Sequence, residues 1–145
     1  MPAPSIRTFR EPDRAHVIDL WRRCGLVRPW NDPSRDVDRK CADDTSMFLV
    51  ATEGQRVAGT VMLGYDGHRG WINYLAVDPD LQRRGIGRLL MENAEQRLDV
   101  LGCPKINLQI RSDNAVAVQF YERLGYAVDH VVSMGKRLVD DEAAE

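Results

Sequence analysis

The stretch VDPDLQRRGIGRLLMENAEQRL, residues 77–98, places a loop rich in glycine and arginine directly before a run of helical periodicity. A helix N-terminus leaves about four backbone N–H groups without partners and carries about half a positive charge, so it attracts anions. Gly85 and Gly87 remove side chains that would keep a ligand away, and glycine adopts the positive φ values that bring successive N–H groups together. Three arginines add local charge: Arg83, Arg84 and Arg88. The loop therefore predicts a phosphate or pyrophosphate site.

Other phosphate-binding motifs do not fit this loop. A P-loop would end in Gly-Lys-Ser/Thr, and a dinucleotide fingerprint would need a third glycine where Leu90 stands. The alternative interpretation is that Gly85 only makes a tight turn and that the arginines are solvated surface residues.

Upstream of the loop the sequence predicts two helices and four strands. Residues 5–10 favour a strand, a helical pattern from Pro12 ends at Gly25, and Asp32 with Pro33 begins a second helix. Residues rich in Val, Leu, Met and Phe form three consecutive strand candidates: 46–52, 56–65 and 71–77. Short turns join these three strands, so we expect them to be antiparallel.

Downstream of the loop the pattern changes to a crossover. A helix follows residues 71–77, and the alternating apolar residues of 105–111 then predict a strand. A strand reached through a helix pairs in parallel with the strand before that helix. Residues 114–125 predict another helix, and residues 126–138 predict one or two final strands. The whole chain, residues 1–145, is therefore predicted to form one mixed α+β domain.

Composition narrows the partners and the location. The chain has 145 residues, 43% of them hydrophobic and 29% charged, and a formal net charge of -2, which gives no general attraction to nucleic acid or anionic membranes. Neither a signal-peptide core nor an apolar run of about 18 residues is present. The odd set of three cysteines lacks the spacing of a metal site or a redox dithiol. We expect a cytoplasmic protein that binds no metal, nucleic acid or membrane.

Two motifs carry a resemblance to a known family. The loop resembles the acetyl-CoA signature of the GCN5-related N-acetyltransferase (GNAT) superfamily, Gln/Arg-x-x-Gly-x-Gly/Ala at the start of the central helix, through Gln82, Gly85 and Gly87. The later stretch SDNAVAVQFYERLGY is similar to the second signature of that family. Its matching positions are Asn114, Tyr121, Leu124, Gly125 and Tyr126. With the order of the elements, the resemblance covers nearly the whole chain.

The resemblance implies a fold, a cosubstrate and a set of site residues. The fold would be a twisted, mostly antiparallel central sheet with one splayed parallel strand pair and helices on both faces. The cosubstrate would be acetyl-CoA, without a metal, and Tyr121 would be the general acid that protonates the departing thiolate. The residues implied in cosubstrate binding are Leu75, Ala76, Val77, Gln82, Arg83, Arg84, Gly85, Ile86, Gly87, Arg88 and Asn114.

The resemblance does not supply a general base. Relatives that acetylate protein N-termini often carry a glutamate where this chain has Gln109, and an amide cannot accept the proton. Water could relay the proton to Asp66 or His68, although their turn can also serve only to connect two strands. Trp30 and Asn31 are candidates for acceptor contacts, with the alternative that Trp30 only anchors its loop.

The leading hypothesis is an N-acetyltransferase that moves acetyl from acetyl-CoA to a primary amine by direct attack in a ternary complex. Two alternatives stay open: a non-catalytic module that binds or senses acyl-CoA, and an acetyltransferase acting on protein N-termini or lysines. A narrower likeness is to the small bacterial YpeA type, through segments such as LWRRCGLVRPWNDPSRDVDRK and SMGKRL. The acceptor is a small molecule or a peptide, and the oligomeric state, a homodimer included, stays open.

Overall fold

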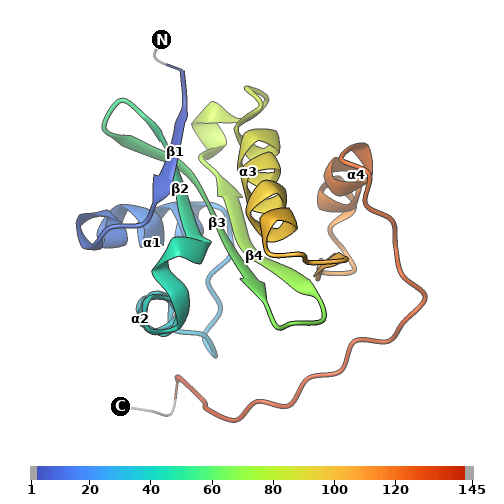
Figure 1. The fold of residues 1–145 in the computed structure, drawn as a ribbon. Helices are drawn as coiled ribbons and strands as arrows, with labels where there is room; N and C mark the ends of the chain where they lie inside the picture. The colour runs from blue at the N-terminus through green and yellow to red at the C-terminus, as the bar shows by residue number, and fades with distance from the viewer. Residues whose placement is uncertain (1–2, 143–145) are drawn as a thin grey trace.

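A five-stranded sheet organises the computed structural model, which describes residues 3–142 (Figure 1). The strands follow one another across the sheet in chain order: β1 Ser5–Thr8, β2 Phe48–Glu53, β3 Arg56–Tyr65, β4 Gly70–Val77 and β5 Ile106–Leu108. The first four strands are antiparallel neighbours, and β4 pairs with β5 in parallel. This arrangement confirms the predicted sheet with one parallel pair.

Helices cover both faces of the sheet, so two cores form. The helices are α1 Arg14–Arg23, α2 Pro33–Asp44, α3 Ile86–Val100 and α4 Ala115–Arg123, and short 3-10 helices span Glu11–Asp13, Thr45–Met47 and Pro79–Leu81. On one face α3 packs on apolar residues such as Leu49 and Ile72, while on the other α1 and α2 pack on residues such as Val50 and Ala76. Because side chains alternate along a strand, neighbouring residues of β2 serve opposite cores.

Local signals define where the helices begin. Asp32 accepts hydrogen bonds from the backbone N–H groups of Ser34 and Arg35, at 2.9 and 3.2 Å, and Pro33 holds the first position of α2. An N-cap carboxylate and a proline at this place stabilise a helix start, as predicted. Among the described residues, none of the helices has the length and apolar character needed to cross a membrane.

The parallel pair separates after three residues. Gly70, Trp71 and Ile72 pair with β5, whereas the rest of β4 runs on to Val77 with no partner on that side among the described residues. The register between β3 and β4 shifts between Thr60 and Met62, and at this irregularity Tyr74 has a φ of 52°. A bulge re-aims a strand, so the predicted splay between β4 and β5 is confirmed.

Helix α1 supports this bulge from the buried side. The indole N–H of Trp21 donates to Thr60 Oγ1 at 2.9 Å, and the Thr60 hydroxyl donates to the Tyr74 carbonyl at 2.9 Å. Both Trp21 and Thr60 are fully buried, so these hydrogen bonds do not compete with water. The polar side chain of Thr60 in an otherwise apolar strand therefore positions the point where the sheet opens.

The prediction of strands over residues 126–138 is wrong. We call residues 127–141 the crossing segment. It leaves α4, passes around the sheet without forming a strand, and ends beside α2 (Figure 1). Side chains hold it in place of backbone pairing: Lys105 Nζ donates to Asp129 at 2.8 Å, Gln109 donates to Ser133, and Arg39 donates to Asp141. These contacts hold both ends of the segment, and β5 has only three residues for pairing. Residues 126–138 therefore do not add strands to the edge of the sheet.

Candidate functional site

The loop before α3 contains two residues in the left-handed region. Gly85 is the N-cap of α3 with a φ of 79°, and Arg83 has a φ of 66°. The structure gives α3 no side-chain cap among the described residues, so its first N–H groups are left for another acceptor. A Cβ placed on Gly85 would meet no atom within 4 Å. The loop is therefore open at the point where an anion would approach.

The side chains of the loop are exposed and carry net positive charge. Arg84 Nη1 lies 3.3 Å from Glu53 Oε1, and Arg88 Nη1 lies 3.9 Å from Glu92 Oε1. The pair of Arg88 is exposed on both sides and therefore weak, so its guanidinium group can turn toward an anion at little loss, whereas Arg84 pairs with a Glu53 side chain that is only 10% exposed. Gln82 reaches back to the carbonyl of Val77 at 3.5 Å. Of the predicted pyrophosphate residues 82–88, residues 82–85 and Arg88 are exposed next to the end of β4, whereas Ile86 and Gly87 are buried.

Gly87 has a packing role that the sequence did not reveal. It is buried, and a Cβ there would lie 3.1 and 3.3 Å from two ring atoms of Phe120 on α4. Gly59, inside β3, is a second missed position, since its Cβ would lie 2.7 Å from the Ala76 carbonyl and 2.9 Å from Leu90. A glycine inside a strand often marks such a close approach. Both glycines let α3 lie close to its neighbours.

Substituting Gly87 with alanine should therefore lower the free energy of unfolding by about 1 to 3 kcal/mol, because the added methyl group overpacks the contact with Phe120. Urea unfolding of the variant measures the change. Gly135→Ala is the matched control, since a Cβ on Gly135 has nothing within 4 Å. Equal stability of Gly87→Ala and the unmodified chain would contradict the packing role.

The backbone of Leu75–Val77 lies where β4 has left β5. Leu75 and Val77 pack on the core under α3, and Ala76 is buried in the core under α1 and α2. On the β3 side Ala76 and Val77 are paired with Thr60 and Gly59. The opposite side has no strand partner among the described residues, which leaves room for a ligand that lies along β4 as an extra strand would. The Val77 carbonyl already accepts from Cys24 Sγ at 3.3 Å and from Gln82 at 3.5 Å.

Asn114 and Tyr121 are positioned by α4. Asn114 is the N-cap of this helix, and its Oδ1 accepts from the backbone N–H of Ala117 at 3.1 Å. The ring of Tyr121 makes edge contacts with Phe120 and Tyr126, with centroids 5.1 and 5.7 Å apart. Burial raises the pKa of Tyr121 to about 12, so its phenol stays protonated near neutral pH and has a proton to donate.

Tyr121 and Gln109 line the same cavity. The cavity measures about 1820 Å³ and lies between β5, α4 and the crossing segment. Gln109 donates to Ser133 of that segment, so its side chain faces the cavity and not the backbone of Leu75–Val77. Among the described residues, the lining includes neither Leu75–Val77 nor the loop 82–88. The structure thus brings the predicted site residues into two neighbouring groups, and not into a single pocket.

The other residues predicted to contact the acceptor amine lie far from the backbone of Leu75–Val77. Asp66 and His68 lie in the turn before β4, about 17 Å along the strand from Leu75. Asp66 accepts from the backbone N–H groups of Arg69 and His68, at 2.7 and 2.8 Å, and these bonds lower its pKa. This geometry gives Asp66 a turn-forming role and does not support the proposed proton relay.

Trp30 and Asn31 lie in the connection between α1 and α2. Trp30 is 42% exposed, so it does not anchor the loop in the core. Asn31 Oδ1 accepts from Arg137 of the crossing segment at 2.8 Å. The connection is therefore joined to the crossing segment and is accessible to solvent.

Sequence reasoning missed Tyr74 and Asp36. The ring of Tyr74 stacks on Trp21 with centroids 3.9 Å apart, and its hydroxyl donates to Asp36 Oδ2 at 2.6 Å. Burial and this hydrogen bond raise the pKa of Tyr74. A positive φ at a tyrosine is rare, and such strained residues concentrate at functional sites. No sequence signal marks this position, because the bulge depends on pairing with β3.

A buried carboxylate ends β4 next to the loop. Asp78 accepts from Arg23 at 3.0 and 3.2 Å, from Arg56 at 2.7 Å and from the backbone N–H of Asp80 at 2.9 Å. Burial alone would raise the pKa of Asp78, but the hydrogen bonds from Arg23, Asp80 and Arg56 lower it to about 2. The carboxylate ties β4 to α1 and β3 just before the residues that form the candidate phosphate site.

Comparison with solved structures supports the same fold. The chain is similar to the PaiA N-acetyltransferase of Thermoplasma acidophilum in complex with coenzyme A, with a TM-score of 0.79, 19% identity and coverage of 90% of this chain and 93% of that chain. It is also similar to glucosamine-6-phosphate N-acetyltransferase of Arabidopsis thaliana, with a TM-score of 0.68, 21% identity and coverage of 94% and 99%. Naa20 of Chaetomium thermophilum in complex with a bisubstrate analogue gives a TM-score of 0.69, 27% identity and coverage of 86% and 71%.

The family comparison agrees with the two sequence motifs. Within the described part of the chain, no group of three His, Cys, Asp or Glu side chains could hold a metal ion. The model of the Acetyltransferase (GNAT) family matches residues 12–126, which include both motifs. The chain therefore belongs to the GNAT acetyltransferase family.

Proposed function

We propose that this protein transfers acetyl from acetyl-CoA to a primary amine by direct attack within a ternary complex. The single observation that carries this proposal is the position of the uncapped N-terminus of α3 beside the unpaired backbone of β4. An anion site next to a free strand edge suits a ligand that has a pyrophosphate and a peptide-like arm. The neighbour crystallised with coenzyme A is consistent with this choice of cosubstrate.

In the proposed reaction, residues 82–88 hold the pyrophosphate, and Asn114 contacts the pantetheine arm. A backbone N–H of Leu75–Val77 donates to the thioester carbonyl as negative charge develops there, an interaction worth about 3 to 4 kcal/mol in a transition state. The amine nitrogen forms a bond to the carbonyl carbon, the C–S bond breaks, and the nitrogen loses a proton to water. The thiolate takes a proton from the protein, and water returns a proton to that donor. Acetyl-CoA supplies the activated acetyl group, and the protein supplies position and charge.

Tyr121 is the proposed donor of that proton. Its phenol is protonated at neutral pH, and its raised pKa makes it a weaker acid than an ordinary tyrosine, which keeps the expected effect on the rate modest. Tyr121→Phe should therefore lower kcat by about 10- to 100-fold and leave acetyl-CoA binding nearly unchanged. Steady-state kinetics and calorimetric titration measure the two effects. Tyr65→Phe, which removes a hydroxyl that contacts only the Gly67 carbonyl among its described hydrogen bonds, is the matched control. Loss of binding in Tyr121→Phe would instead indicate a packing role.

The proposed acceptor class rests on the sequence of β4, Gly70–Val77, which supplies neither a carboxylate nor an imidazole side chain. Holding a lysine-like amine of pKa about 10.4 neutral at pH 7 takes about 4.6 kcal/mol, against about 1.4 kcal/mol for an α-amine of pKa about 8. An amine of low pKa therefore needs less help from the protein. The likeness to the YpeA type does not identify an acceptor. It supports only our proposal of the subfamily to which the chain belongs.

Release of free thiol from acetyl-CoA, measured against a panel of small amines and peptides, tests the proposed function. Saturable release with at least one small amine is the expected result. Saturable binding of acetyl-CoA without release by any acceptor would favour the binding module, since Gln109 cannot act as a base. Release only with long peptides would favour a protein acetyltransferase.

A further inference from the structure

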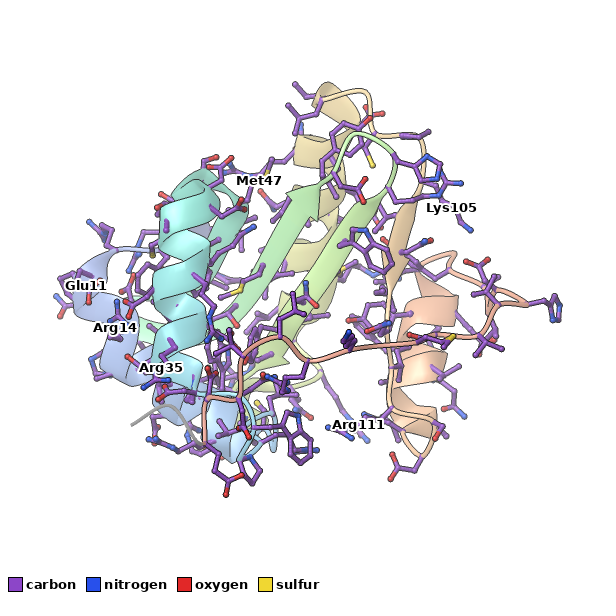
Figure 2. All side chains as sticks on the ribbon, turned by 90° about the horizontal axis from the view of Figure 1, so that it is seen from below. Glu11, Arg14, Arg35, Met47, Lys105 and Arg111 are labelled. Carbon is purple, nitrogen blue, oxygen red and sulfur yellow. The ribbon has the colours of Figure 1, made fainter. Side chains whose placement is uncertain are left out.

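The N-terminal end of α2 surrounds a carboxylate that comes from the far end of the crossing segment. The side chain of Asp141 is 1% exposed. Its Oδ2 accepts from the backbone N–H of Asp32 at 2.8 Å and from Arg39 Nη1 at 3.1 Å, and its Oδ1 accepts from Arg39 Nη2. Arg35 Nη1 lies 3.8 Å from Oδ1. Figure 2 shows the crossing segment reaching α2 close to the labelled Arg35. One backbone amide and two guanidinium groups thus form a carboxylate site.

The rest of the crossing segment contributes little burial. Its apolar side chains are exposed, among them Val132 at 88% and Met134 at 91%. Exposed apolar side chains give no hydrophobic stabilisation, so the segment is held mainly through its polar ends. Local opening of a segment with few buried contacts costs less free energy than global unfolding. Asp141 is therefore the main buried anchor of the far end of the segment, and its displacement would release that end.

This carboxylate site is linked to the point where the sheet splits. Arg39 Nη1 also donates to Asp36 Oδ1 at 3.0 Å, and Asp36 Oδ2 accepts from the Tyr74 hydroxyl at 2.6 Å. Tyr74 directly precedes Leu75 on β4, in the bulge. The chain of contacts lies on the face covered by α1 and α2, whereas α3 covers the other face. An acceptor on this face would meet the thioester from the side opposite α3.

We propose that this site, formed by Arg35, Arg39 and the amide of Asp32, binds the carboxylate of the acceptor, and that Asp141 occupies it until the acceptor displaces it. The acceptor is then a primary amine that carries a carboxylate. The proposal rests on the proposed acetyl transfer for the identity of this ligand as acceptor.

Charge and shape favour a carboxylate over a phosphate. Arg39 donates through two nitrogen atoms to the two oxygens of Asp141, the planar geometry that suits a carboxylate. Asp32 and Asp36 lie against the same arginines, at 3.9 Å from Arg35 and 3.0 Å from Arg39. These two acids would repel a doubly charged phosphate more strongly than a singly charged carboxylate.

The first experiment follows the backbone amide of Asp32 by NMR while acetate is added to the full chain. In Asp141→Ala the Asp32 amide should shift saturably, with a Kd at least 10-fold lower than in the unmodified chain. Asp140→Ala, which removes an exposed neighbouring acid, is the matched control and should behave as the unmodified chain. Adding Arg39→Gln to Asp141→Ala should abolish the shift. Equal titrations with and without Asp141, or tighter binding of inorganic phosphate than of acetate, would overturn the proposal.

The second experiment compares glycylglycine, whose α-amine has a pKa of about 8, with glycylglycinamide, which lacks the carboxylate. Binding of each is measured by the same amide shift without acetyl-CoA, so that it can be read even if no amine is acetylated. Asp141→Ala should bind the compound that carries the carboxylate at least 10-fold more tightly than the unmodified chain does. The variant and the unmodified chain should bind the compound that lacks the carboxylate equally. Where transfer occurs, KM for the carboxylate compound should fall by the same factor with kcat unchanged. Equal binding of both compounds would overturn the proposal.

Discussion

Replacing Gly85 with aspartate should weaken acetyl-CoA binding at least 100-fold, about 2.7 kcal/mol, without unfolding the protein. Gly85 is the N-cap of α3, has a φ of 79°, and faces open space. Aspartate tolerates left-handed φ better than most residues and is a favoured N-cap. Its carboxylate would accept from the N–H groups that the pyrophosphate needs and would add negative charge at the same point. Calorimetric titration with acetyl-CoA measures the loss.

Gly85→Ala is the matched control for this substitution. Alanine is strained at this positive φ, which lowers the free energy of unfolding by about 1 kcal/mol. Its side chain adds no charge and no hydrogen-bond acceptor. We expect its affinity for acetyl-CoA to stay within a few fold of the unmodified chain. If aspartate and alanine at position 85 both leave the affinity unchanged, the pyrophosphate does not bind at this helix start.

Asp78→Ala should lower the free energy of unfolding by about 3 kcal/mol. The substitution removes a fully buried carboxylate and leaves Arg23, Arg56 and the Asp80 amide without their acceptor. Losing one partner of a buried ion pair is strongly destabilising, although both guanidinium groups here are partly exposed and can be hydrated. Urea unfolding at pH 7 measures the difference.

Asp80→Ala is the matched control, because Asp80 is 76% exposed and pairs only at 3.4 Å with Arg56. It should change stability by less than about 0.5 kcal/mol. The pH dependence gives a second measurement. Since the pKa of Asp78 is about 2 in the folded chain and about 3.9 when unfolded, its contribution is complete above pH 4 and is lost as the pH falls toward 2. A stability gap to Asp78→Ala that persists unchanged at pH 2 would contradict this account.

The sequence predicted the elements whose signals are local. Asp32 and Pro33 mark the start of α2 because capping needs only residues within one turn. The helix between β4 and β5 implied their parallel pairing, and Gly85 marked a left-handed turn before α3. In each case the residues that cause the local structure are close together in the sequence, so the sequence pattern was sufficient to predict it.

The features that the sequence did not reveal depend on distant contacts. Asp141 meets Arg39 across 102 residues, and residues 126–138, which the sequence predicted as strands, lead to this contact without pairing with the sheet. Tyr74 takes its strained φ from the register of β3, and Gly87 is required by Phe120 on another helix. These causes arise from tertiary packing, which periodicity does not report.

The most direct test of the whole account is the NMR spectrum of backbone amides during titration with coenzyme A. If the carrier lies along β4 with its pyrophosphate on α3, the amides of Leu75–Val77 and of Gly85–Arg88 shift together and saturate at the same concentration. Shifts confined to the cavity beside β5, for example at Asn107 and Met134, with the α3 loop unchanged, would contradict it.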